Sequence, residues 1–310
     1  MNNDDIQFHP EMEPEEPEFI IERDDEGEPS EGPTEIPESN KWKKWLLWTI
    51  AVLTLLLLTC GAYKGWRLYN ARKLGITISI SPKQNIKKLQ APLKEQTAEV
   101  KCDSDSIMGV KFDYYELIGV RASIEFEEPK LTNDSVYLYC RSVDHDTDST
   151  YLGSLVVNGV EIQSDRSSRL GYMAMMDDHM VIGVSRSEAV KDYVKENGGS
   201  FFRQFVLVSN GDVPPRFYLN GKKIRKAIGR MEDNKGDKIF FISTRNEVTV
   251  RDFANALRMY GFIDAIYITG GYDYCYYRDS NRQRHDIGDI KNYPQKNWKG
   301  IIPWLVFRKR

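Results

Sequence analysis

The feature that most constrains this 310-residue chain is an uncharged apolar run at residues 45–63. It holds 19 residues, and about 20 apolar residues in a helix cross the hydrocarbon core of a bilayer. Trp42, Trp45 and Trp48 lie around its start, and Tyr63, Trp66 and Tyr69 lie around its end, as in the aromatic belts at membrane interfaces. The sequence therefore predicts one transmembrane helix with its flanks at residues 41–66. The run begins too far along the chain and is too long for a cleaved signal peptide, which favours a signal anchor.

The net charge is negative before this run and positive in the remainder of the chain. The first 40 residues hold 15 of the 46 acidic residues and one of the 43 basic residues, a net of -14, so the remainder carries a net of +11. Residues 1–40 also hold six prolines and little apolar surface. Such a segment cannot bury enough surface to offset its ordering entropy, so we expect a disordered acidic tail. A docking tail for a basic protein partner and a simple solvated terminus both fit this composition.

Basic residues next to the run do not decide its orientation. Three lysines precede it, and Lys64, Arg67, Arg72 and Lys73 follow it. The positive-inside count is therefore nearly tied.

Beyond the membrane segment we expect a polar stalk at residues 67–100 and a folded domain at residues 101–310. Short apolar runs bounded by turn residues predict strands. An Asn158-Gly159 pair predicts a hairpin turn, and Pro303 predicts that the last strand lies at a sheet edge. The expected strands are residues 76–80, 118–126, 136–140, 152–157, 160–162, 180–184, 201–208, 238–243, 265–268 and 298–307.

Two helices are expected between the strands. Ser185 and Glu188 form a capping-box pattern at the start of a helix that ends at Asn197-Gly198-Gly199. Thr249 can cap a second, amphipathic helix that ends at Gly261. The predicted fold class is α+β, a mixed β-sheet with helices packed on it, preceded by a single transmembrane helix and the disordered acidic tail.

Two glycine pairs mark the candidate site, because paired glycines let a ligand approach the backbone. Aromatic residues and arginines, whose planar fork binds phosphate oxygens, accompany both pairs. The candidate binding residues are Gly198, Gly199, Arg203, Gln204, Arg225, Thr269, Gly270, Gly271 and Arg278. Asp273 and Asp279 are the candidate acid or base. Each arginine taken alone also fits an ordinary surface residue.

The sequence predicts no metal site, because the spacing of its histidines and cysteines matches no known ligand pattern. No motif indicates a cofactor, and we expect no nucleic-acid partner. Cys102 and Cys140 could form one disulfide if the domain lies in an oxidising compartment. Buried thiols fit the sequence equally well.

An ordered series of motifs runs through the second half of the chain. It comprises Gly198-Gly199 with its aromatic-arginine segment, the runs 207–211, 225–229 and 238–243, the second helix, and residues 265–271. In this series the chain resembles the phosphodiester glycosidase family, with its uncovering-enzyme-like domain. Residues 272–279 resemble a bacterial membrane-anchored branch. The resemblance implies hydrolysis of sugar phosphodiesters or related envelope glycans. It also implies a sugar-phosphate or anionic glycan ligand, a cytoplasmic tail and an extracytoplasmic domain on the cell membrane.

One position departs from the family pattern. The family commonly has Asp where this chain has Thr269, and a hydroxyl cannot replace a carboxylate as acid, base or charged ligand. Either the carboxylate of Asp273, four residues further along the chain, replaces the missing one, or the site binds its ligand without catalysing a reaction. The alternatives to a hydrolase are a catalytically degenerate anionic-glycan-binding or envelope scaffold module, and a signalling scaffold whose output is the acidic tail.

Overall fold

The structure is a computed structural model, and the residues it describes are 41–73, 81–93, 95–130, 132–143, 151–164, 169–217, 219–234, 236–268, 274–288 and 302–310. The chain divides into two units, Met1–Gly61 and Ala62–Arg310, which we treat separately. The predicted acidic tail and the predicted strand at residues 76–80 lie outside the described residues.

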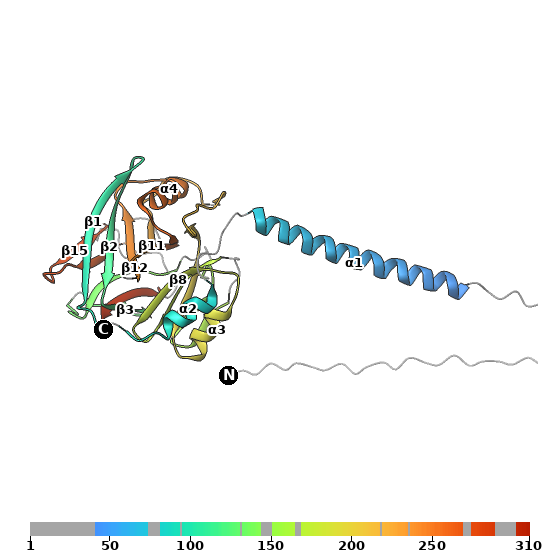
Figure 1. Cartoon of the computed structure of the whole chain (residues 1–310), viewed down its shortest axis with the longest axis horizontal. Helices are drawn as coiled ribbons and strands as arrows, with labels where there is room; N and C mark the ends of the chain where they lie inside the picture. The colour runs from blue at the N-terminus through green and yellow to red at the C-terminus, as the bar shows by residue number, and fades with distance from the viewer. Residues whose placement is uncertain are drawn as a thin grey trace, which may run out of the picture. The chain divides into compact units, whose positions relative to one another are not determined.

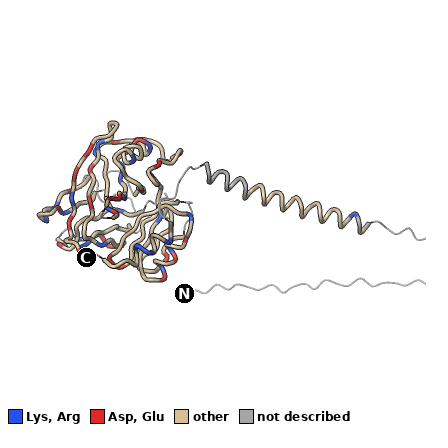
Figure 2. The backbone as a smooth tube through the Cα atoms, in the orientation of Figure 1, with Lys and Arg blue, Asp and Glu red and all other residues tan. Residues whose placement is uncertain are grey.

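Helix α1 (Lys41–Lys73) contains the predicted apolar run. By length and composition, Lys44–Tyr63 is long and apolar enough to cross a membrane, and no other helix among the described residues passes that test. None of this window is buried, and Figure 2 shows it free of charge along its apolar part. The Thr54 hydroxyl donates to the carbonyl of Ile50 at 2.8 Å, which satisfies this polar group within the helix itself. The helix therefore fits a single-pass membrane anchor.

Three antiparallel sheets form the second unit. The first has the order β1 (Glu99–Ile107), β2 (Val110–Ile118), β12 (Gly236–Thr244), β11 (Lys226–Asp233), β13 (Asp264–Ile268), β10 (Val206–Val208). The second has the order β15 (Arg284–Ile287), β14 (Cys275–Arg278), β4 (Val136–Arg141), β16 (Trp304–Lys309), β3 (Val120–Glu125). The third has the order β6 (Val160–Gln163), β5 (Leu155–Val157), β9 (Ser200–Gln204), β7 (Gly171–Met176), β8 (His179–Val184).

The sheet-rich α+β class is confirmed, with two differences in the strands. We expected one mixed sheet, whereas all pairs among the described residues are antiparallel and belong to three sheets. The predicted edge position of the last strand is wrong, because β16 lies between β4 and β3. Pro303 precedes its first residue, so the missing N–H costs no ladder hydrogen bond.

One core joins the three sheets. Ile228 and Phe241 come from the first sheet, Leu138 from the second, and Met173 and Phe202 from the third, and all are buried in a single cluster. Helices α2 (Pro82–Leu89) and α3 (Ala189–Glu196) cover the third sheet, and Figure 1 shows them side by side. Residues expected to form part of the stalk therefore pack on the domain, since Leu89 of α2 is buried against the third sheet.

Helix α4 (Val250–Tyr260) covers the outer face of the first sheet, with Phe253 and Leu257 fully buried. Its predicted ends are confirmed. The Thr249 hydroxyl accepts from the Asp252 N–H at 3.1 Å, and Gly261 closes the helix in the left-handed region at φ 112°, where glycine is favoured.

Removal of the Thr249 hydroxyl tests this cap. We expect Thr249→Ala to lower the free energy of unfolding by about 1 kcal/mol, because an N–H of the first turn loses its acceptor. Urea unfolding of the detergent-solubilised chain measures it. Thr249→Ser keeps the hydroxyl and is the matched control, so equal losses in the two variants would contradict the cap.

The predicted start of the other helix is wrong. Helix α3 begins after Glu188, which makes no side-chain cap, and Ser185 instead accepts from the Ser187 N–H at 3.0 Å. The cause is Arg203, whose guanidinium donates to the carbonyls of Ser185 and Ser187. These contacts hold residues 185–187 as an irregular turn ahead of the helix.

Candidate functional site

The C-terminal end of β13 is the place where several polar segments meet. Its last residue, Ile268, pairs with Lys226 at the start of β11. The Tyr267 N–H donates to the carbonyl of Phe205 at 2.8 Å, and Phe205 separates β9 from β10. The start of β11 and the end of β9 therefore flank the end of β13, although they belong to two different sheets.

Arg225 is the central residue of this region. It is 2% exposed. Its Nε donates to the Val248 carbonyl at 3.3 Å and its Nη2 to the Gly221 carbonyl at 2.8 Å. The guanidinium lies 5.9 Å from the ring centroid of Tyr267. Among the described residues Arg225 contacts no carboxylate, and its Nη1 makes no hydrogen bond. A buried positive charge with only neutral partners favours a bound anion.

Arg169 is held beside the same strand end. It is buried, and its Nη1 donates to Gln204 Oε1 at 2.6 Å. Its guanidinium carbon lies 3.9 Å from the ring centroid of Phe205, a cation–π contact that orients the planar group. The rings of Phe205 and Tyr267 are 6.4 Å apart, so Arg169 and Arg225 lie on two neighbouring aromatic rings.

Lys226 completes the set, which we call the basic cluster: Arg169, Gln204, Arg225 and Lys226. The side chain of Lys226 is buried. Burial raises the pKa of the Cys140 thiol, and the positive charge of Lys226 partly opposes that larger effect. As consecutive residues of an extended segment, Arg225 and Lys226 point to opposite faces of the sheet. The basic cluster therefore places side chains on both faces of the sheet at the end of β13. Gln204 and Arg225 were predicted from sequence, whereas Arg169 and Lys226 were not.

Arg203, although predicted as a binding residue, is engaged with the protein through both of its terminal Nη atoms. It is 1% exposed and donates to the carbonyls of Arg169, Ser185 and Ser187 and to Glu188 Oε1 at 2.8 Å. These contacts stabilise the turn before α3. The side chains of Arg203 and Gln204 point to opposite faces of β9, so Gln204 alone joins the basic cluster.

Arg278 ends β14, and Asp279 begins the turn that leads to β15. Asp279 Oδ1 accepts from the N–H groups of Asn281 and Gln283, and Oδ2 lies 2.8 Å from His285 Nε2. The bond to His285 holds the pKa of Asp279 below its usual value. Arg278 lies 3.4 Å from the Asp134 carboxylate. The contacts of Asp279 are those of a residue that organises a turn.

Four predicted site residues lie outside the described residues: Thr269, Gly270, Gly271 and Asp273. They follow Ile268 directly in the sequence.

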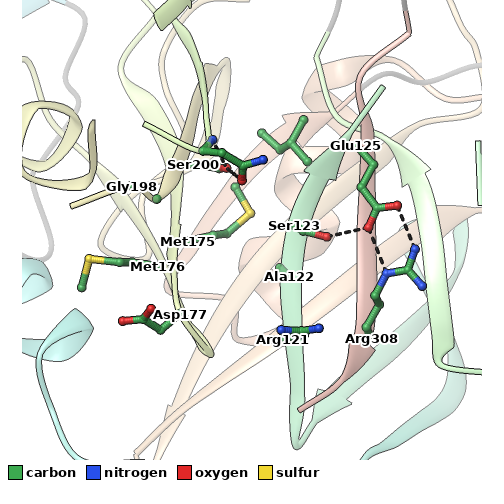
Figure 3. A pocket seen from close by; sticks show the side chains of 13 residues that line it. Arg121, Ala122, Ser123, Glu125, Met175, Met176, Asp177, Gly198, Ser200 and Arg308 are labelled. Carbon is green, nitrogen blue, oxygen red and sulfur yellow. Dashed lines mark hydrogen bonds and ion pairs between the residues drawn. The ribbon is translucent and has the colours of Figure 1, made fainter. Parts of the chain in front are cut away.

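Gly198 and Gly199 line a different cavity (Figure 3). It has a volume of about 340 Å³ and lies between β3, with Arg121 and Glu125, and the turn after β7. No member of the basic cluster lines it. Gly199 directly precedes β9 and Gln204 ends it, so the two are separated by about 16 Å at the rise of an extended strand.

The role of Gly199 in packing leads to a stability prediction. A Cβ at this position would meet the Met175 carbonyl oxygen at 2.5 Å and Val194 Cγ1 at 2.7 Å. We therefore expect Gly199→Ala to destabilise the protein by about 2 kcal/mol through overpacking. Thermal unfolding measures it, with Gly211→Ala as a control for backbone strain, because the position of Gly211 is open. A stable Gly199→Ala variant with altered ligand affinity would instead indicate a binding role.

A comparison with protein families identifies the fold that carries this cluster. A model described as phosphodiester glycosidase matches residues 140–304, more than half of the chain. The chain belongs to the phosphodiester glycosidase family. The matched range includes the whole basic cluster, and the family resemblance seen in the sequence is confirmed.

Solved structures give distant matches. The chain is 13% identical to the zebrafish N-acetylglucosamine-1-phosphodiester alpha-N-acetylglucosaminidase catalytic domain auto-inhibited by its pro-peptide; the match covers 72% of this chain and 86% of that chain, with a TM-score of 0.48. A hypothetical protein from Synechocystis is 10% identical over 70% of this chain and 64% of that chain, with a TM-score of 0.49. No curated protein matches the chain.

Proposed function

We propose that the protein is a membrane-anchored, extracytoplasmic hydrolase that acts on sugar phosphodiesters or related envelope glycans. The observation that carries the proposal is Arg225, a buried guanidinium with carbonyl partners alone among the described residues. It lies within the range matched by the phosphodiester glycosidase model. A phosphodiester carries one negative charge, which compensates a buried arginine through charge-assisted hydrogen bonds.

In this proposal the basic cluster binds and orients the phosphate. Arg225 donates its unused Nη1 to a non-bridging oxygen, and Arg169 donates from the position set by Gln204 and Phe205. Lys226 adds positive charge from the other face of the sheet. Neutralising the phosphate makes it a better leaving group, because negative charge develops on it as the glycosidic bond breaks.

Proton transfer is assigned to Asp273 in this proposal. It stands five residues along the sequence from Ile268, the last residue of the strand whose end the basic cluster surrounds. Asp279, the other candidate, already accepts three hydrogen bonds in its hairpin. Water is the acceptor of the sugar.

Helix α1 supports the anchored arrangement, with the acidic tail in the cytoplasm and the domain outside. Reporter fusions test the orientation. An enzyme that is active only in an oxidising compartment should work when fused after residue 310 and fail when fused before residue 1. The reverse pattern would overturn the proposed placement without affecting the proposed chemistry.

A nitrophenyl phosphate diester of a sugar tests the reaction. Cleavage of the glycosidic bond releases free sugar and nitrophenyl phosphate, whereas attack at phosphorus expels nitrophenol, the better leaving group, and leaves the sugar phosphate. We expect free sugar from the diester and none from the nitrophenyl glycoside, which lacks the phosphate. Purified protein that releases no sugar from any such diester would overturn the proposal.

A non-catalytic binding module is the second candidate, favoured by one observation in the sequence. Thr269 stands where the family commonly has Asp, and its hydroxyl cannot act as a charged acid or base. This candidate predicts that sugar phosphates raise the unfolding temperature while no sugar is released. Thr269→Asp separates the two candidates further, because it should create turnover in a degenerate site.

A further inference from the structure

Cys140 and Cys275 face each other across two neighbouring strands. Strands β4 and β14 are antiparallel, with Tyr139 opposite Tyr276 and Leu138 opposite Tyr277. One step further along the same register brings Cys140 of β4 opposite Cys275 of β14. Both residues are thiols in the structure.

Side-chain direction agrees with this register. Cys140 and Cys275 are 1% and 0% exposed and belong to the core cluster shared by the three sheets. Tyr139 and Tyr276 lie in a separate cluster on the other face of the second sheet, as alternation along a strand requires. Burial, with Cys275 beside it, raises the pKa of the Cys140 thiol well above its usual range. The two sulfur atoms are therefore neighbours in the core.

We propose that Cys140 and Cys275 form a cross-strand disulfide in the mature protein. Directly opposed residues of an antiparallel pair have Cα atoms about 4.5–5.5 Å apart, within the range of about 4.4–6.8 Å found for disulfides. The Sγ–Sγ bond forms by exchange with a disulfide donor, either a small-molecule disulfide or a thiol–disulfide oxidoreductase. The two protons and two electrons of the thiols pass to the donor, which leaves as two thiols.

This bond differs from the Cys102–Cys140 bridge that the sequence left open. Cys102 lies on β1 opposite Tyr115 and is exposed, so it is not the cross-strand neighbour of Cys140. The Cys140–Cys275 bond joins β4 to β14 and encloses residues 141–274, which include the basic cluster. It restricts the unfolded chain and fixes the point where the chain re-enters the second sheet after residues 269–273. In the cell its formation rests on the proposed extracytoplasmic placement, since such compartments are oxidising.

Peptide mapping of the full-length, detergent-solubilised protein tests the bond. After purification and blocking of thiols, trypsin should give a linked pair of peptides 131–141 and 259–278, which separates on reduction. The same protein equilibrated in an oxidising glutathione buffer should give the same pair, whatever its orientation in the cell. Recovery of both peptides unlinked and alkylated from that oxidised sample, or linkage of 131–141 to the Cys102 peptide 102–111, would overturn the proposal.

Reduction should also lower the midpoint of thermal unfolding by roughly 5–10 °C. Cys140→Ser and Cys275→Ser should each abolish this shift, and Cys102→Ser and Cys60→Ser should retain it. Where a serine variant fails to fold, the wild-type peptide map still decides. A shift that survives in Cys275→Ser would count against the bond. The hydrolysis assay is independent of these measurements, so a protein without turnover can still carry the disulfide.

Discussion

Replacing Asp264 by alanine is expected to lower the free energy of unfolding by about 3–5 kcal/mol, the cost of breaking a buried ion pair from one side. Asp264 is fully buried, and its Oδ2 accepts from Arg230 Nε at 3.0 Å and Nη2 at 2.7 Å. Its Oδ1 accepts from the Asn210 N–H. The variant leaves Arg230, 2% exposed, without its buried carboxylate and leaves a backbone donor without its acceptor.

Glu232→Ala is the matched control for that prediction. Glu232 contacts the same arginine at 3.3 Å, but its side chain is 58% exposed, so the loss should stay below about 1 kcal/mol. Chemical denaturation of the detergent-solubilised chain compares the two variants. Similar losses for Asp264→Ala and Glu232→Ala would show that burial does not control the strength of this network.

Arg225→Gln is expected to reduce kcat/KM for sugar phosphodiesters by at least about 100-fold, which corresponds to about 2.7 kcal/mol of lost transition-state stabilisation. The physical reason is that the buried guanidinium supplies the charge that meets the phosphate. The loss of its bonds to Gly221 and Val248 also costs roughly 1–2 kcal/mol of stability. Circular dichroism should therefore show a folded variant with a lower melting temperature.

Arg121→Gln is the control for the loss of a positive charge. Arg121 is exposed and lines the cavity next to Gly198 and Gly199, not the basic cluster. Its variant should keep wild-type turnover. An Arg225→Gln variant as active as Arg121→Gln would remove the basic cluster from the reaction.

Local signals predicted much of the fold. Strands β4, β8, β12 and β13 follow from short apolar runs, and the hairpin at Asn158-Gly159 is present, with both residues at positive φ. Helix α4 follows from its periodicity, the Thr249 cap and Gly261. Strand β1 was not predicted because most of its side chains are exposed or half-exposed, so it carries no apolar pattern. It pairs with β2 in a hairpin that turns at Met108-Gly109, both at positive φ, and this turn lacks the Asn or Asp that usually marks such a pair.

The candidate site, like the fold, could be predicted from the sequence only in part. Arg203 and Arg225 look alike in sequence, since each lies within four residues after a glycine turn and is followed by a short apolar run. In the structure Arg203 donates to the carbonyls around Ser185 and to the Glu188 carboxylate, whereas Arg225 contacts no carboxylate among the described residues. The partners of each arginine depend on which loop packs against the face of the strand that carries it. The predicted strand at residues 201–208 gave no sign of this, because Phe205 divides it between two sheets.

Calorimetric titration with a methyl diester analogue of a sugar 1-phosphate, in which carbon replaces the glycosidic oxygen, tests the anion site most directly, because the analogue cannot be hydrolysed and binding is separated from turnover. We predict saturable binding to the wild-type protein that weakens with added salt, binding at least about tenfold weaker in Arg225→Gln, and unchanged binding in Arg121→Gln. Equal affinity of the wild-type and Arg225→Gln proteins for the diester would contradict the assignment of the phosphate to the end of β13.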